Sequence, residues 1–322
     1  MDQLIALHLA AVTAGFLLDR LIGDPPGWPH PVRWIGTWIS WLMKRLNRGE
    51  YRTAKGMVLL IVVVLPASLA AGLLTYAAFW IHPAAGAVME SVLIAVALAQ
   101  KSLGDAAHDV AVPLAAGDLP EARRKLSWIV GRDTDSLDEP EITRGVVETV
   151  SENSSDGVTA PLLFAFLLGA PGIWLYKAVN TLDSMVGYKD ERYAQFGTAS
   201  ARTDDVLNFI PARLTGLAIV LLSPNPSGLP LKSRLAGWRS DARKHPSPNS
   251  GWLEAATAWQ LGATLGGTNT YRGVTSRRPQ FGPGLRPLSA IDIDRTLVQL
   301  TRASWAVWAL GILIGGLCYA IA

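Results

Sequence analysis

The sequence predicts an all-α, polytopic integral membrane protein with about four to six membrane helices. Half of the 322 residues are hydrophobic and only 17% are charged, whereas about 25% of residues are charged in soluble domains. Several apolar segments reach the roughly 20 residues that a helix needs to cross a bilayer. The formal charge of +3 is ordinary for such a protein, because its cytoplasmic loops collect Lys and Arg. The lipid bilayer is therefore an expected partner, and nucleic acid is not.

Four segments are the clearest membrane helices. They lie near residues 4–22, 57–81, 87–103 and 305–322, and residues 158–176 and 206–222 are two doubtful spans. The polar regions 104–157, 177–205 and 223–302 separate these segments and are expected to carry the functional site. We treat residues 1–322 as a single membrane-embedded domain.

A basic segment, residues 41–55, orients the chain. It carries five Lys or Arg residues and one Glu, so it is expected in the cytoplasm. The second and third spans then form a hairpin that turns at His82-Pro83 and returns the chain to the cytoplasm. The functional site is therefore expected on the cytoplasmic face of the inner cell membrane.

The middle segments do not fit a simple alternation. If residues 158–176 crossed the membrane, the polar region 177–205 would lie outside, away from the acidic stretch whose charges it complements. The break Gly169-Ala170-Pro171-Gly172 allows a re-entrant or buried helical hairpin instead, since irregular backbone at membrane depth is tolerated where protein covers it. We favour the hairpin. The basic region 223–302 should also be cytoplasmic, so either both middle segments span or neither does.

The acidic stretch from Arg132 to Asp156 is the main candidate site. Only Arg132 and Arg144 balance its carboxylates, which are Asp133, Asp135, Asp138, Glu139, Glu141, Glu148, Glu152 and Asp156. A cluster of this kind beside an apolar segment requires cations. Mg²⁺, a phosphate-bound metal or an amine substrate would each serve.

A helix over residues 143–155, opened by Pro140, would order this stretch. Arg144, Glu148 and Glu152 then recur on one helical face. The alternative is a solvated face with a ladder of Arg–Glu–Glu salt bridges.

The loop before this helix offers Asp133 and Asp135 at alternating positions. Oxygen ligands on a flexible loop suit Mg²⁺, which uses one or two carboxylates when it also binds substrate phosphates. The alternative is an acidic turn that only caps helices. After the helix, Asn153 and Asp156 stand at the junction with the apolar segment.

Two later segments offer partners for the acidic stretch. Residues 177–189 carry Lys177, Asn180, Asp183 and Lys189, and ionisable groups in an apolar helix are functional candidates by default. The alternative there is an internal Lys–Asp pair that holds two helices together. Residues 201–208 carry Arg202 and Asp204 beside Thr203, a predicted N-cap; the alternative is a capped helix with a surface charge cluster.

Other chemistries find no support in the sequence. The single cysteine, Cys318, excludes an internal disulfide and a cysteine-based metal site. The small-residue run 262–271 could cradle an anion with its backbone N–H groups. It lacks the Gly-Lys-Ser/Thr of a Walker A motif, so no standard nucleotide motif is present.

Four stretches carry a resemblance that covers nearly the whole chain. They are LLDRLIGDPPGWPHPVRWIG, GRDTDSLDEPEITRGVVETVSENSSDGVTAPLLFAFLLGAPG, KAVNTLDSMVGYKDERYAQFGTASARTDDVLNFIPARL and HPSPNSGWLEAATAWQLG. Together they resemble the adenosylcobinamide-phosphate synthase family, the CobD/CbiB membrane proteins of cobalamin biosynthesis. The combination is far more specific than any single motif.

The resemblance implies an ATP-dependent acid–amine ligase. A propionate carboxylate of adenosylcobyric acid would be joined to (R)-1-amino-2-propanol O-phosphate, or to aminopropanol, through an acyl phosphate. The product would be adenosylcobinamide phosphate or cobinamide. ATP is the implied co-substrate, Mg²⁺ the cofactor, and cobalt is present only within the corrinoid. The resemblance also leaves room for contacts with other membrane enzymes of late cobalamin assembly.

The residue roles that fit this reaction are hypotheses. Glu148, Glu152, Asp156 and Asp183 are the catalytic candidates, and Asp133 and Asp135 are the candidate metal ligands. The candidates for binding substrate or phosphate are Arg132, Arg144, Asn153, Lys177, Asn180, Lys189, Arg202 and Asp204.

Three other functions remain open. A transporter of a corrinoid or phosphorylated solute would also place carboxylates and Lys in membrane helices. A membrane phosphotransferase would use acidic metal ligands, and a non-catalytic sensor would tolerate loss of the acidic cluster. Consumption of ATP together with formation of an amide separates the ligase from all three.

Overall fold

The computed structural model describes residues 2–25, 27–188 and 190–321, and it divides the chain into two compact units. Unit 1 consists of Met1–Lys101, Ala160–Asn208 and Trp308–Ala322, and unit 2 consists of Ser102–Thr159 and Phe209–Val307. A single domain over residues 1–322 was predicted from the sequence, and this division was not. Each unit is described by itself.

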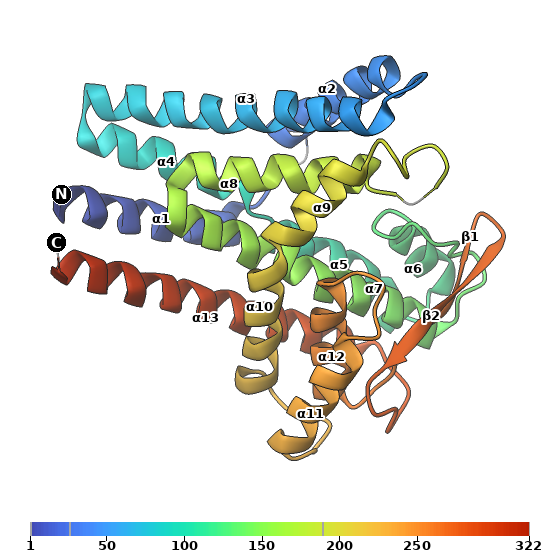
Figure 1. The fold of residues 1–322 in the computed structure, drawn as a ribbon. Coiled ribbons are helices and arrows are strands. Elements are labelled where there is room, and N and C mark those ends of the chain that lie inside the picture. The colour runs from blue at the N-terminus through green and yellow to red at the C-terminus, as the bar shows by residue number, and fades with distance from the viewer. Residues whose placement is uncertain (1, 26, 189, 322) are drawn as a thin grey trace. The chain divides into compact units, whose positions relative to one another are not determined.

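Unit 1 is built from helices. They are α1 (Asp2–Ile22), α2 (Pro31–Leu46), α3 (Arg52–Ile81), α4 (Pro83–Ala97), α8 (Ala160–Val186), α9 (Thr198–Leu207) and the C-terminal half of α13 (Ile291–Ile321). Helices α3 and α4 form the predicted hairpin (Figure 1). His82 ends α3, where its backbone N–H donates to the Ala78 carbonyl at 3.1 Å, and its side chain caps α4, where Nδ1 accepts the Ala84 N–H at 3.1 Å.

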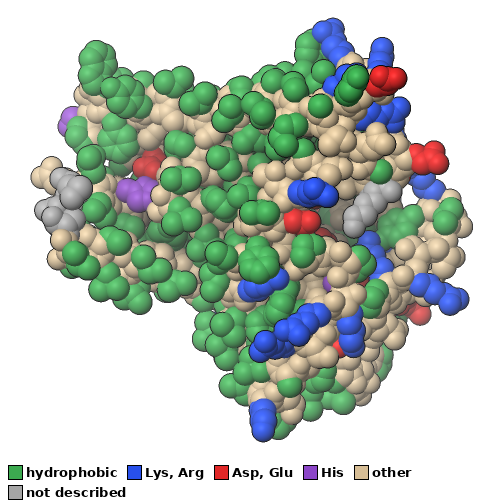
Figure 2. Space-filling view, viewed as in Figure 1, with side chains coloured by type: hydrophobic (Ala, Val, Ile, Leu, Met, Phe, Trp, Pro, Cys, Tyr) green, Lys and Arg blue, Asp and Glu red, His purple; other side chains and the backbone are tan. Residues whose placement is uncertain are grey.

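The long helices identify a polytopic membrane protein. Among the described residues, five helical stretches are long and apolar enough to span, or six if the pair α9 and α10 counts as one span. They include the predicted segments 4–22, 57–81, 87–103 and 305–322, with longer bounds at α3, at Pro83–Ala115 and at α13. Large apolar side chains such as Leu69, Leu73 and Trp80 are exposed along α3, and Figure 2 shows hydrophobic side chains spread over the surface.

Helix α8 breaks where the sequence predicted a break. Gly169 has φ +63 and ψ −151, and the two arms of α8 run back beside one another (Figure 1). The break leaves carbonyl groups at the end of the first arm without the helical N–H groups that would otherwise donate to them. The Phe166 carbonyl instead accepts a hydrogen bond from His8 Nε2 at 3.1 Å. The other His8 nitrogen lies 3.0 Å from Glu90 Oε1. The hairpin within α8 is thus fixed by polar contacts from α1 and α4.

Unit 2 surrounds α7 (Glu139–Asn153) and the π-helix η1 (Ser154–Thr159). Its other elements are α5 (Gln100–Ala115, from residue 102), α6 (Leu119–Leu126), α10 (Phe209–Leu222), α11 (Leu231–Ala242), α12 (Ser250–Leu261), β1 (Leu265–Tyr271), β2 (Val274–Phe281) and the start of α13. Val147 of α7 is fully buried in a cluster with residues of α10, α12 and both strands.

A two-stranded antiparallel hairpin interrupts the otherwise helical chain. Strands β1 and β2 pair from Leu265 opposite Phe281 to Tyr271 opposite Val274, with a bulge between Gly266 and Gly267. The sequence analysis gave this run a role in anion binding and did not predict the strands. Gly266 (φ +78) would place a Cβ 2.1 Å from the Pro279 carbonyl, so the bulge requires glycine there.

The predicted start of α9 at Thr203 is wrong. The helix begins at Thr198, and the Thr203 hydroxyl lies inside it, where it donates to the Ala199 carbonyl at 2.8 Å. A mid-helix Thr can bond the carbonyl four residues earlier, as well as cap a helix. Sequence alone therefore did not decide between the two positions.

Replacing Gly169 with Ala should destabilise unit 1. The added Cβ would lie 2.4 Å from Glu90 Oε1, and the alanine would have to adopt φ +63, a conformation that L-residues rarely adopt. We therefore expect the free energy of unfolding to fall by about 1–3 kcal/mol. The free energy of unfolding in an SDS titration measures it. Gly316→Ala is the matched control, since its added methyl meets open space on α13. Equal stability of the two variants would contradict the packing described here.

Candidate functional site

Helix α7 begins at Glu139, before the predicted range 143–155 but with Pro140 in its first turn as expected, and it carries much of the acidic stretch. The Asp138 carboxylate caps it by accepting the Glu141 N–H at 3.0 Å, and Pro140 stands in the first turn. The predicted Arg144–Glu148–Glu152 face is present, but Arg144 and Glu148 are only 5% and 7% exposed. The alternative of a solvated ladder is therefore wrong for these two residues.

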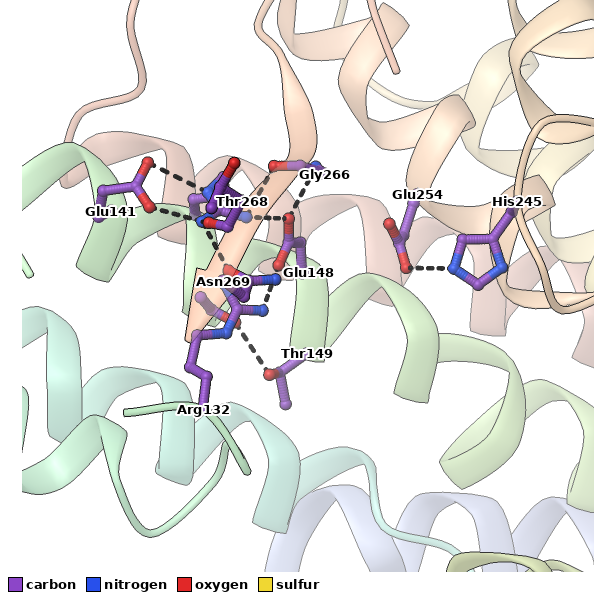
Figure 3. A network of polar contacts seen from close by, with 11 residues as sticks. Arg132, Glu141, Glu148, Thr149, His245, Glu254, Gly266, Thr268 and Asn269 are labelled. Carbon is purple, nitrogen blue, oxygen red and sulfur yellow. Dashed lines mark hydrogen bonds and ion pairs between the residues drawn. The ribbon is translucent and has the colours of Figure 1, made fainter. Parts of the chain in front are cut away.

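Arg144 fastens α7 to strand β1. Its guanidinium donates to carboxylates of its own helix and to oxygens of the strand (Figure 3). The acceptors are Glu141 Oε1 and Oε2 (3.2 and 2.5 Å), Glu148 Oε1 (3.0 Å), Gly266 O (2.8 Å), Thr268 O (3.1 Å) and Asn269 Oδ1 (2.7 Å). These contacts occupy all five of its N–H groups. The geometry thus favours a structural role for Arg144 over the predicted phosphate binding.

Glu148 is equally engaged. Its Oε1 accepts the Gly266 N–H at 2.8 Å and its Oε2 pairs with Arg132 Nη2. A carboxylate held between two guanidinium groups and a backbone N–H has most of its hydrogen-bonding capacity already used by the protein. Its predicted catalytic role stays a prediction, and its contacts are those of a structural anchor.

Arg132 has spare hydrogen-bonding capacity. Within the described residues it donates two hydrogen bonds, from Nη1 to Asn269 Oδ1 at 2.9 Å and from Nη2 to Glu148 Oε2 (Figure 3). The other three of its five N–H groups have no hydrogen bond within the described residues. Its side chain is only 7% exposed, and buried donors of this kind are normally satisfied. Arg132 therefore fits the predicted role of binding an anionic group.

One turn beyond Glu148, Glu152 faces α12. Its Oε1 accepts the Ser250 hydroxyl at 2.9 Å, and no described residue bonds its Oε2. Close by, His245 Nε2 lies 3.7 Å from Glu254 Oε1, and both side chains are buried (Figure 3). These two residues were not among the sequence candidates.

The His245–Glu254 pair is closer to two neutral groups than to an ion pair. Burial, and then the carboxylates of Glu148 and Glu152, raise the pKa of Glu254 well above its ordinary value. Burial lowers the pKa of His245. The 3.7 Å separation lies in the ion-pair range, but both pKa shifts favour the uncharged forms, so we describe the pair as neutral.

The predicted metal loop is occupied by the protein itself. Asp133 Oδ1 and Oδ2 accept the N–H groups of Arg272 and Gly273, at 2.9 and 2.8 Å, and so hold the tip of the β1–β2 hairpin. Asp135 is exposed. No group of three or more His, Cys, Asp or Glu side chains in the described part of the chain could hold a metal ion. A preformed Mg²⁺ site therefore does not fit this loop, and the metal role stays a prediction.

The junction residues lie at a distorted helix. Asn153 Nδ2 donates to the Thr149 carbonyl at 2.9 Å, and Asp156 is half-buried in η1. The neighbouring Ser155 hydroxyl is buried without a hydrogen bond in the described chain. Short π-helical segments are frequent at functional sites, which keeps Asp156 a candidate.

The remaining candidates belong to unit 1. Asp204 is buried and accepts from Asn180 Nδ2 (3.4 Å) and Asn208 Nδ2 (2.9 Å), so it ties α9 to α8. Lys177 lies near enough to Asp19 for their charges to interact. Asp183 is half-buried at the end of α8 and Arg202 is exposed. Lys189 lies outside the described residues.

Comparison with known proteins decides the family. The family model described as "CobD/Cbib protein" matches residues 12–300. The chain belongs to the CobD/CbiB family. It is 49% identical over 318 residues to a "Cobalamin biosynthesis protein CobD" of Halalkalibacterium halodurans, covering 99% of this chain and 100% of the relative.

Other CobD/CbiB relatives are similarly close. A CobD of Geobacter metallireducens is 52% identical over 286 residues, with 87% of this chain and 88% of the relative covered. A "Cobalamin biosynthesis protein CbiB" of Salmonella typhimurium is 46% identical over 323 residues, with 97% and 98% covered. No solved structure matches the chain.

The site residues that sequence reasoning missed are His245, Glu254 and Asn269. The first two stand inside HPSPNSGWLEAATAWQLG, a stretch that carried the CobD/CbiB resemblance. A lone Glu within the apolar helix of this stretch was the available signal, since an ionisable residue among apolar ones is costly to bury. Asn269 stands in a strand that was not predicted, so no sequence signal pointed to it.

Removing the Arg144 guanidinium should strongly destabilise unit 2. Arg144→Gln leaves buried acceptors of α7 and β1 without donors, and we expect a loss of about 3–5 kcal/mol of unfolding free energy. Chemical denaturation of the purified protein measures this loss. Arg124→Gln is the control, because Arg124 forms the same i, i+3 pair with Glu121 on the exposed surface. A comparably small effect in both variants would contradict the structural role of Arg144.

Proposed function

We propose that the chain catalyses ATP-dependent amide formation between a corrinoid carboxylate and an aminoalcohol phosphate. The substrates would be adenosylcobyric acid and (R)-1-amino-2-propanol O-phosphate, or aminopropanol itself. The family supports a place in cobalamin biosynthesis. The observation that carries the proposal is the buried Arg132 guanidinium, with unused N–H groups beside the carboxylates of α7 and α12.

The proposed reaction needs both a positively charged group, for the phosphoryl oxygens, and a carboxylate, for the amine. A carboxylate does not acylate an amine unaided, because oxide is a poor leaving group. In the proposed reaction, ATP therefore first converts the corrinoid carboxylate to an acyl phosphate. Phosphoryl oxygens that gain charge in this step are stabilised by preorganised donors in a buried site. Arg132 supplies such donors. Glu152, with an oxygen that no described residue bonds, can attract the ammonium group of the second substrate.

Magnesium enters this scheme with its nucleotide. Mg²⁺ keeps several waters and usually binds through substrate phosphates and one or two carboxylates, so Mg-ATP does not need the preformed cluster that the described residues lack. Asp156 and Asp135 stay candidates for such a carboxylate. The roles of the unit 1 candidates Lys177, Asn180, Asp183, Lys189, Arg202 and Asp204 stay predictions and are not part of this scheme.

The site is proposed to face the cytoplasm at the inner membrane. The basic end of α2 and the start of α3 carry Lys44, Arg45, Arg48 and Arg52, and such segments remain on the cytoplasmic side. ATP is available in that compartment.

Purified protein in detergent should convert adenosylcobyric acid, the aminoalcohol phosphate and Mg-ATP to the amide. Mass spectrometry identifies the amide, and nucleotide analysis shows whether ADP or AMP forms. Uptake of a corrinoid into liposomes without ATP consumption would indicate a transporter instead. Transfer of a phospho-alcohol without an amide would indicate a phosphotransferase, and absence of any product would count against all three.

Arg132→Gln should lower kcat/KM for Mg-ATP by about 10²–10³-fold, the usual effect of removing one charge-stabilising donor. Arg132→Lys should recover part of the loss, since it keeps the charge without the fork of donors. Arg123→Gln is the control, because Arg123 also lies in unit 2 but donates to the Leu137 carbonyl. A wild-type kcat/KM in Arg132→Gln would remove Arg132 from the proposed site.

A further inference from the structure

Two buried polar groups of unit 2 lack the partners that burial demands. Glu254 is 3% exposed, and no residue of the described chain forms a hydrogen bond with it; His245 Nε2 lies 3.7 Å from its Oε1. His245 Nε2 is likewise buried without a hydrogen-bond partner in the described chain. Buried polar groups are almost always satisfied, and exceptions call for an explanation such as a ligand.

The tautomer of His245 follows from its other nitrogen. Nδ1 accepts the Ser247 N–H at 2.9 Å, which is shorter than its 3.3 Å separation from the Ser247 carbonyl, so in the neutral ring the proton is on Nε2. That N–H is directed at Glu254 (Figure 3). At 3.7 Å this N–H faces Glu254 without forming a hydrogen bond, and Nε2 is not available as a base. The proton acceptor of this pair is the Glu254 carboxyl group.

The charges around Glu254 favour an added cation. Glu148 and Glu152 of α7 raise its pKa, while Arg278 of β2 and Arg132 before α7 oppose them. With Glu254 neutral, the carboxylates of Glu141, Glu148 and Glu152 are matched by the guanidinium groups of Arg132, Arg144 and Arg278. Once Glu254 ionises, the set carries one net negative charge. A ligand carrying one positive charge would balance this set, and it would supply the N–H donors that Glu254 lacks.

We infer that Glu254, oriented by His245 and assisted by Glu152, binds the ammonium group of the amine substrate and removes its proton before it attacks. This inference rests on the proposed function and names the site of its second substrate. The approaching ammonium favours the ionised carboxylate, so the proton that neutral Glu254 carries leaves to solvent before the transfer. One proton passes from the ammonium to Glu254. The free amine then attacks the acyl carbon, the C–O bond to phosphate breaks, and a second N–H proton leaves with the phosphate as HPO₄²⁻.

A raised pKa suits Glu254 to this step. A base is most effective when its pKa approaches the operating pH, and positioned bases contribute about 10²–10⁴-fold. Amide formation should therefore rise with pH as Glu254 ionises. This rise should be absent in Glu254→Gln, in which any remaining pH dependence reflects deprotonation of the amine substrate in solution.

The test separates activation of the carboxylate from attack by the amine. Full-length protein with Mg-ATP and adenosylcobyric acid is assayed with the aminoalcohol phosphate, and separately with hydroxylamine, which is uncharged at neutral pH and needs no base. In Glu254→Gln we expect amide formation to fall about 100-fold, while hydroxamate formation stays within about threefold of wild type.

His245 is tested as a positioning residue. In His245→Gln the side-chain amide nitrogen can replace Nε2–H, so this variant should keep more amide formation than His245→Asn, whose side chain is too short. His108→Gln is the matched control: its Nε2 lies 3.6 Å from Asp294 on the exposed surface of the same unit. It should match wild type in both assays.

Each result bears on a definite claim. A parallel fall of amide and hydroxamate in Glu254→Gln, or amide formation at the wild-type rate, would overturn the inference alone. Wild-type protein that forms hydroxamate but no amide would also overturn it. Wild-type protein that forms neither product would overturn the proposed reaction, and the inference with it.

Discussion

The charge-assisted hydrogen bonds of Arg144 are the interaction on which unit 2 depends. One guanidinium joins helix α7 to strand β1 through two carboxylates, two carbonyls and a side-chain amide. Such bonds are shorter and stronger than neutral ones and impose a fixed geometry. They place the hairpin on α7, and the hairpin in turn brings Asn269 to Arg132. The buried carboxylate of Glu148 is tolerated because it lies between the two guanidinium groups.

Along one face of α7, Arg144 and Glu148 stabilise the fold, whereas Glu152 can bind a ligand. Arg144 and Glu148 use their hydrogen-bonding capacity on the protein, whereas Glu152, one turn later, keeps an oxygen for a ligand. The spacing that suggested a reactive row is therefore real, but only its last member is available. Arg132, from the loop before α7, supplies the spare donors that Arg144 lacks.

Much of the fold could be predicted because it depends on local pattern. Apolar length identified α1, α3, α4 and α13, and Gly169-Ala170-Pro171-Gly172 located the break in α8. The start of α7 was visible in Asp138 and Pro140. The roles of single charges could not be read in the same way, because they depend on strands more than a hundred residues distant. Asp133 resembles a metal ligand in sequence, yet its oxygens bind the turn at Arg272 and Gly273. Glu254 looked like part of an apolar helix until α7 carboxylates were found beside it.

The hairpin contacts also set the order in which the chain can fold. Asp133 and Gly273 are 140 residues apart in sequence, and Glu148 and Gly266 are 118 apart. Contacts of such separation form slowly, since a long loop must close first. During synthesis, α7 emerges well before its partners on β1, and for that interval its acidic groups have only Arg132, Arg144 and water to neutralise them. The apolar hairpin of α3 and α4 precedes both in the chain. The contacts that join α7 and its preceding loop to the β1–β2 hairpin therefore form only after the first membrane helices have been synthesised.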